Sequence, residues 1–148
     1  MTPKRPRPLL TRSQLAVVAL AAQGLENTAI ADRRDSAENT IKAQMRSAGS
    51  RLGTNGTRAA TVAAACQAGL LAHLPVERRR PDLSLRLVDT LHGIAAGMTD
   101  QQIADKAGKP LGTVKSRTKA LYAELGATGR AHVVLIGWQL GLWGGEEQ

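Results

Sequence analysis

Apolar residues recur at helical spacing along most of the chain, and runs typical of β-strands are missing. The pattern is clearest between residues 103 and 126, which predict a short helix, a tight turn at Gly108 and a longer helix that opens at Pro110. One face of the longer helix carries Val114, Leu121 and Leu125, with Thr118 at the remaining step of the stripe. A short helix, a turn and a second helix anchored by one face predict a helix-turn-helix motif.

The opposite face of the longer helix is basic. Lys115, Ser116 and Lys119 lie there, and Arg117 lies on the flank. The segment 106–123 contains five basic residues and no acid. A run of charge is usually no more than a solvated helix face, so one copy of this pattern is weak. The same charges on the same face of a second copy favour an anion-binding surface.

A second, earlier copy is present, because the chain repeats itself. Sliding the sequence by 73 residues superimposes its halves, and a one-residue gap in a loop changes the offset to 72. The matched groups are Leu10 with Leu83, Gly24 with Gly97, Ile30-Ala31-Asp32 with Ile103-Ala104-Asp105, Thr40-Ile41-Lys42 with Thr113-Val114-Lys115, Leu52-Gly53 with Leu125-Gly126, and Arg58-Ala59 with Arg130-Ala131. We interpret this as a tandem duplication of a four-helix unit.

The predicted fold class is all-α, with two helix-turn-helix domains in tandem. In the first domain, we expect a helix that stops at Gly24, then helices around 27–34, from about 37 to 51 and from about 58 to 71. The expected organisation is a basic, disordered arm at 1–8, a first domain at 9–72, a basic proline-flanked linker at 73–82, a second domain at 83–143 and a flexible tail at 144–148.

Charge and composition narrow the chemistry. The formal net charge of +8 favours an anionic partner such as nucleic acid. The single cysteine, Cys66, excludes an internal disulfide and is interpreted as a small core residue. The three histidines are scattered, so no metal or other cofactor is expected. No paired carboxylates, nucleophile–base set or glycine-rich phosphate loop is present, which predicts that the protein is not an enzyme.

No run of residues approaches the ~20 apolar residues of a membrane span. The basic N-terminus followed by LAVVALAAQG has some features of a secretion signal. We interpret this run as an amphipathic first helix instead, because the equivalent run of the second copy, VDTLHGIAAG, has no signal-like character. A cytoplasmic protein without a membrane partner is expected.

Each half resembles the DNA-binding domain of the LuxR/GerE family, a four-helix helix-turn-helix module. The resemblance is carried by Leu10-Thr11, Ile30-Ala31, Thr40-Ile41-Lys42 and Leu52-Gly53 in the first half, and by Leu83-Ser84, Ile103-Ala104, Thr113-Val114-Lys115, Leu125-Gly126 and Arg130 in the second. Residues 112–117 are also similar to region 4 of small sigma factors, and the fourth helix favours the LuxR/GerE type.

The resemblance implies base and phosphate contacts from the third helix of each half. The positions are Lys42, Ala43, Gln44 and Arg46 in the first half and Lys115, Ser116, Arg117 and Lys119 in the second. Gln44 can read adenine and Arg117 guanine if either reaches a base edge. Thr40 and Thr113 could bond phosphate, or only cap or pack. Arg58 and Arg130 could reach the DNA backbone, or an acid within the fold.

The first half departs from the family pattern at three positions. Arg34 replaces an apolar residue, Asp35 replaces the turn glycine, and Gly49 is expected to interrupt the third helix at a cost of about 1 kcal/mol. The second half is therefore expected to be the more intact, and the first either reads DNA beside it or braces it.

The two fourth helices predict how the halves assemble. In the family this helix is the usual dimerisation surface. The first is rich in small residues, whereas the second is apolar nearly all round and contains Trp138 and Trp143. We expect the two to pair within one chain as a pseudo-two-fold dimer. The competing expectation is a homodimer of chains through the tryptophan-bearing helix.

The function predicted from these features is a sequence-specific transcription regulator that inserts two tandem recognition helices into the major groove of double-stranded DNA. The alternative is a protein-interaction regulator whose degenerate helix-turn-helix folds bind RNA polymerase or another transcription factor. Arg34, Asp35 and Gly49 are the residues that favour this alternative.

Overall fold

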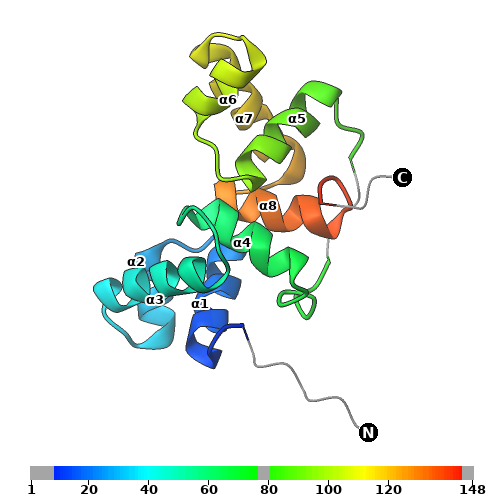
Figure 1. Ribbon diagram of the computed structural model, residues 1–148. Helices are drawn as coiled ribbons and strands as arrows, with labels where there is room; N and C mark the ends of the chain where they lie inside the picture. Colours follow the sequence, from blue (N-terminus) through cyan, green and yellow to red (C-terminus); the bar gives the residue numbers. More distant parts are fainter. Residues whose placement is uncertain (1–8, 77–80, 145–148) are drawn as a thin grey trace, which may run out of the picture.

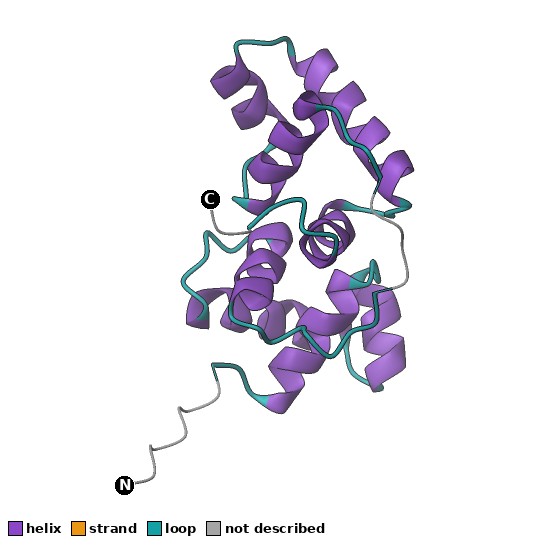
Figure 2. Ribbon diagram, turned by 90° about the vertical axis from the view of Figure 1, so that its right-hand side faces the viewer, coloured by secondary structure: helices purple, strands orange, loops and turns teal. Residues whose placement is uncertain are grey.

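The computed structural model describes residues 9–76 and 81–144, and within these ranges the chain is helical with no strand (Figures 1 and 2). The helices are α1 (Arg12–Ala22), α2 (Asn27–Arg34), α3 (Glu38–Arg51), α4 (Arg58–Gln67), α5 (Leu85–Ala95), α6 (Asp100–Ala107), α7 (Leu111–Leu125) and α8 (Arg130–Gln139). The all-α prediction is therefore confirmed for the described residues. The predicted arm at 1–8, the centre of the predicted linker and residues 145–148 of the predicted tail lie outside them.

Local sequence determines where several helices begin. At α6, the Thr99 amide donates to Gln102 Oε1 at 2.8 Å and the Gln102 amide donates to Thr99 Oγ1 at 3.1 Å, and the two bonds form a capping box. Thr11 and Gln14 form the same reciprocal pair at the start of α1. The signal-like run LAVVALAAQG forms most of α1, with Val17 and Val18 fully buried in the core.

The turns between α2 and α3 and between α6 and α7 also follow the sequence. Gly108 adopts the left-handed conformation between α6 and α7, with φ of 66°. Asp35, which stands at the equivalent position between α2 and α3, adopts the same conformation with φ of 52°. Aspartate tolerates this region better than most residues, so the substitution leaves the turn between α2 and α3 in place.

Two expectations for the first half are wrong. The fourth helix ends at Gln67 rather than near residue 71, because Gly69 turns left-handed and the Leu70 amide bonds back to the Ala65 carbonyl oxygen. Gly49 does not interrupt α3, which continues to Arg51. Gly49 is instead buried where a Cβ atom would lie 2.9 Å from Thr61 Oγ1 on α4. A glycine at this position lets two helices approach closely.

Helices α4 and α8 lie against each other at the centre of the molecule (Figure 1). The α2–α3 and α6–α7 pairs lie on opposite sides of this central pair. Helices α5 to α8 follow α1 to α4 in order and nearly in length: 11, 8, 15 and 10 residues against 11, 8, 14 and 10. The central pair thus separates the α2–α3 pair from the α6–α7 pair.

The apolar side chains of α8 are covered within one chain. Val133 and Val134 are fully buried, and Trp143 is 5% exposed and donates from Nε1 to the Val134 carbonyl oxygen at 2.7 Å. The Trp138 and Trp143 rings lie 5.1 Å apart, centroid to centroid. The surface that a homodimer through this helix would need is therefore largely occupied by the chain itself.

Cys66 on α4 is also buried, and desolvation raises the pKa of its thiol to about 12. This environment agrees with the prediction of a small core residue and keeps the thiol protonated. Among the described residues, no helix has the length and apolar character needed to cross a membrane.

Candidate nucleic-acid interface

Helix α7 is held by one face and exposes the other. Its inner face carries Val114, Leu121 and Leu125, which are buried where α7 packs against the other helices of the second half. Thr118, the polar residue in this stripe, is 7% exposed and donates from Oγ1 to Asp100 Oδ1 on α6 at 3.2 Å. Lys115, Ser116 and Lys119 are exposed on the other face, as the spacing predicted. The threonine therefore fixes α7 on α6 while the lysines face outward.

Helix α3 has the same arrangement in the first half. Ile41, Met45 and Ala48 are buried, whereas Lys42, Ala43 and Arg46 are exposed. The exposed residues of α3 and α7 occupy equivalent positions in the repeat. Each unit thus presents a basic outer face on a helix anchored by its inner face.

Gln44 and Arg117 occupy a different position from their neighbours. Both are only partly exposed, on the flanks of α3 and α7. The Gln44 Oε1 atom is covered, and the described residues offer it no hydrogen-bond partner. Arg117 lines a cavity of about 390 Å³ that Asp89 and Lys106 also border. The two residues expected to read adenine and guanine therefore lie beside the outer faces rather than on them.

The two threonines of the predicted site lie in the first turn of their helices. Thr40 is exposed and Thr113 is half-buried. Neither caps its helix, since Ala37 and Pro110 occupy the N-cap positions. The capping role left open for them is therefore wrong.

An acid lies on the outer face of α3. Glu38, in the first turn of α3, has a carboxylate oxygen 3.6 Å from Lys42 Nζ. The equivalent position in α7 is Leu111. This contact is absent from the predicted site, although an acid four residues before a lysine on a helix is the spacing that signals it. The ion pair leaves α3 with a less positive outer face than α7.

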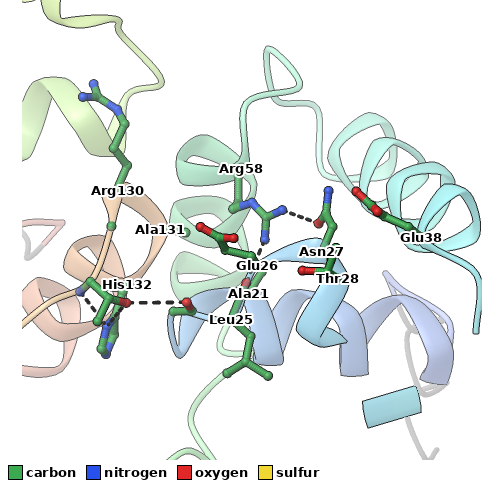
Figure 3. A pocket seen from close by; sticks show the side chains of 13 residues that line it. Ala21, Leu25, Glu26, Asn27, Thr28, Glu38, Arg58, Arg130, Ala131 and His132 are labelled. Carbon is green, nitrogen blue, oxygen red and sulfur yellow. Dashed lines mark hydrogen bonds between the residues drawn. The ribbon is translucent and has the colours of Figure 1, made fainter. Parts of the chain in front are cut away.

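Arg58 and Arg130 point into the fold. Arg130 donates from Nη1 to Asp100 Oδ1 at 2.8 Å and from Nη2 to the Met98 carbonyl oxygen. Arg58 makes the matching pair of bonds, to Asn27 Oδ1 and to the Leu25 carbonyl oxygen (Figure 3). Burial lowers the pKa of Arg58, and the nearby Glu26 carboxylate opposes this shift. The expected acid within the fold is therefore found for Arg130, which pairs with Asp100, whereas Arg58 bonds to a side-chain amide and a backbone carbonyl oxygen.

Each arginine fixes the start of a fourth helix to the start of a second helix. Both arginines also line the pocket of about 670 Å³ drawn in Figure 3, where α8 meets the α1–α2 turn. Their guanidinium groups are engaged by Asn27 and Asp100, so the positive charge at this junction serves the fold.

The two halves are joined by a reciprocal contact. Asn55, in the α3–α4 loop of the first half, donates from Nδ2 to the carbonyl oxygen of Gly97, in the α5–α6 turn of the second half, at 3.0 Å. Thr128, in the α7–α8 loop of the second half, has its Oγ1 atom 3.5 Å from the carbonyl oxygen of Gly24, in the α1–α2 turn of the first half. The 73-residue offset that superimposes the halves pairs Asn55 with Thr128 and Gly24 with Gly97. From the sequence alone, Gly24 is predicted only as a helix stop.

Comparison with known families identifies part of the chain. Residues 8–64 match the family model of bacterial regulatory proteins of the luxR family. No curated protein and no solved structure matches the chain. The first half therefore contains a helix-turn-helix domain of the luxR family, and this family match implies a DNA-binding transcription regulator. The match covers α1 to α3 and most of α4, in the half that was expected to be the less intact.

Proposed function

We propose that this chain is a sequence-specific transcription regulator in which both halves present a recognition helix, α3 and α7, to the major groove of double-stranded DNA. The observation that carries the proposal is the pair of equivalent basic faces, Lys42, Ala43 and Arg46 on α3 and Lys115, Ser116 and Lys119 on α7. Lysine and arginine on an anchored, exposed helix supply phosphate contacts and bidentate contacts to guanine. The family match supports this for the first half.

In this proposal the second half is a second domain of the same kind, and the two halves form a pseudo-dimer within one chain. Contact between α4 and α8 supports it, since the equivalent helix of each half supplies the surface. The matching arginine bonds to Asn27 and Asp100 support a common architecture. The edge of the DNA interface would be formed by Gln44, Arg117, Thr40 and Thr113. The other two candidates, Arg58 and Arg130, would support DNA binding only by stabilising the fold.

The alternative is a protein-interaction module with degenerate helix-turn-helix folds. Two of the three residues that favoured it, Asp35 and Gly49, do not disrupt the first half. Asp35 forms the left-handed turn that the motif needs, and Gly49 lies in a continuous helix. Neither residue breaks the unit that it belongs to. We therefore retain DNA binding as the proposal and make binding to RNA polymerase an outcome of its test.

The test begins with in vitro selection of duplex DNA on the full chain. Affinity for the selected duplex is then measured for Lys42→Ala, Arg46→Ala, Lys115→Ala and Lys119→Ala. Each should lower affinity about 5- to 100-fold if it contacts a base and less if it contacts phosphate alone. Arg86→Ala is the matched control, because Arg86 is exposed on α5, outside both helix-turn-helix units.

Raising the salt concentration should weaken binding, and each variant that removes a phosphate contact should flatten this dependence by about one unit of slope. Equal losses in all variants and in Arg86→Ala would indicate charge attraction without a recognition surface. Selection that enriches no sequence, together with retention of RNA polymerase, would replace this proposal by the protein-interaction alternative.

A further inference from the structure

The contact between the halves is isologous, meaning that each half offers the same surface to the other. Asn55 reaches the Gly97 carbonyl oxygen, and its repeat equivalent Thr128 reaches the carbonyl oxygen of Gly24. A head-to-tail arrangement would bring two different surfaces together, whereas reciprocal contacts require an approximate two-fold axis. The contact of α4 with α8 meets the same requirement.

The glycines at this contact are spatially constrained. A Cβ atom on Gly97 would overlap the Asn55 amide, and a Cβ atom on Gly24 would overlap Thr128 Oγ1. Both glycines also have positive φ, 97° for Gly24 and 85° for Gly97. The approach of the halves therefore depends on a glycine on each side of the two-fold axis.

An approximate two-fold axis relates α3 of the first half to α7 of the second. Recognition helices related in this way read half-sites of opposite orientation on the duplex, because the symmetry of the site mirrors that of the protein. The exposed residues, however, differ between the halves at two of the three repeat positions: Ala43 stands against Ser116, and Arg46 against Lys119. Different side chains at the groove select different bases.

The two units also differ in charge. Segment 106–123, which contains α7, has five basic residues and no acid. The equivalent segment 33–50, which contains α3, has four basic residues and two acids, Asp35 and Glu38. Phosphate attraction should therefore be stronger at the α7 half-site.

Building on the DNA-binding function proposed above, we infer that one chain binds an asymmetric operator made of two unlike half-sites in inverted orientation. Covalent linkage of unlike units gives the complex a single orientation on DNA, which a dimer of identical chains on a palindrome cannot have. The α7 half-site holds the protein more strongly, and the α3 half-site sets its direction.

The test uses the selected duplex and four derivatives. In one derivative, the second half-site is reversed to make a direct repeat; in two others, one half-site is scrambled; in the fourth, the stronger half-site is duplicated as a palindrome. Affinity and stoichiometry are measured for the wild-type chain, Lys42→Ala and Lys115→Ala, with circular dichroism as the check on folding. Both substitutions are at exposed positions, so the variants should fold.

We expect a one-to-one complex, and we expect the direct repeat to bind at least about tenfold more weakly than the selected duplex. Scrambling the half-site read by α3 should abolish the effect of Lys42→Ala but not that of Lys115→Ala. Scrambling the half-site read by α7 should do the reverse. The palindrome should show no gain in affinity over the selected duplex. Its second copy of the stronger half-site faces α3, which does not match that sequence.

Three results would overturn the inference: two chains per duplex, equal or better binding to the direct repeat, or both variants losing their effect when the same half-site is scrambled. Each of these leaves sequence-specific DNA binding intact. A selection that enriches no sequence would overturn the proposed function as well, so the two failures are distinguishable.

Discussion

The Lys42 ammonium group lies 3.6 Å from the Glu38 carboxylate on the outer face of α3, and both side chains are about half exposed, at 51% and 45%. An exposed ion pair of this kind contributes little to stability, typically about 0.3–0.5 kcal/mol. Its larger effect is on binding, because a carboxylate beside a DNA-facing lysine repels phosphate and occupies the ammonium group.

Glu38→Gln should therefore raise the affinity for the selected duplex about two- to fivefold at low salt, since removing one repulsive charge at an exposed site changes the free energy by up to about 1 kcal/mol. Fluorescence anisotropy with a labelled duplex would measure this. Glu124→Gln removes another exposed acid, near the end of α7, and serves as the control. Affinity that stays constant or falls would remove α3 from the proposed interface.

Gly97→Ala should destabilise the protein more than Gly53→Ala. Both residues have positive φ, which costs an alanine about 1–2 kcal/mol. A Cβ atom on Gly53 meets nothing within 4 Å, whereas one on Gly97 would overlap Asn55, adding about 1–3 kcal/mol. Urea denaturation of the two variants would measure the difference.

The double variant Asn55→Ala/Gly97→Ala isolates the contact between the halves. It should recover part of the loss caused by Gly97→Ala, because the overlapping amide is gone. Strict additivity of the two single changes would show that the halves are not in contact at this point.

Gly49→Ala and Gly112→Ala should change stability in opposite directions, although both glycines lie in helices. Alanine normally stabilises an exposed helix by up to about 1 kcal/mol relative to glycine, and a Cβ atom on Gly112 meets nothing within 4 Å. A Cβ atom on Gly49 would lie 2.9 Å from Thr61 Oγ1 and 3.1 Å from Thr54 Oγ1. Overpacking there should cost about 1–3 kcal/mol. A gain in thermal stability for Gly49→Ala would contradict the close approach of α3 and α4.

Arg130→Ala should act on folding before it acts on DNA. It removes two hydrogen bonds, one of them to the Asp100 carboxylate, and should lower the free energy of unfolding by about 1.5–3 kcal/mol. Lys119→Ala, on the outer face of α7, should change it by less than about 0.5 kcal/mol. Thermal unfolding without DNA separates the two roles, and a fully stable Arg130→Ala variant would return this arginine to the candidate DNA contacts.

The Cys66 thiol should make stability fall at alkaline pH. Burial raises its pKa to about 12, whereas an unfolded cysteine ionises near about 8.5. Above about pH 8.5 the folded state therefore keeps a proton that the unfolded state loses. The thiol leaves the free energy of unfolding unchanged below about pH 8.5 and lowers it by about 1.4 kcal/mol per pH unit above that value. Denaturation between pH 8 and 10.5 should show a steeper decline for the wild-type chain than for Cys66→Ala. Burial also raises the pKa of Tyr122, which titrates in both proteins and cancels in the comparison.

Patterns that act within one or two helical turns could be predicted from the sequence. The buried stripes of α3 and α7 follow from residues three and four apart on one helix face. The Thr99–Gln102 capping box and the left-handed turns at Gly108 and Asp35 depend on neighbouring backbone, so their residues identify them. The Glu38–Lys42 pair belongs to this group, and the sequence contained the spacing that reveals it.

Relationships between segments far apart in the chain were decided by tertiary structure. The sequence determined that helices with basic outer faces form in both halves, because periodicity is a property of each segment alone. It did not determine that Arg58 and Arg130 bond within the fold, that Gly49 admits α4, or that Asn55 meets Gly97. A side chain's residue type limits the bonds it can make, but its partner depends on which helices pack together, and that choice is made by the whole core.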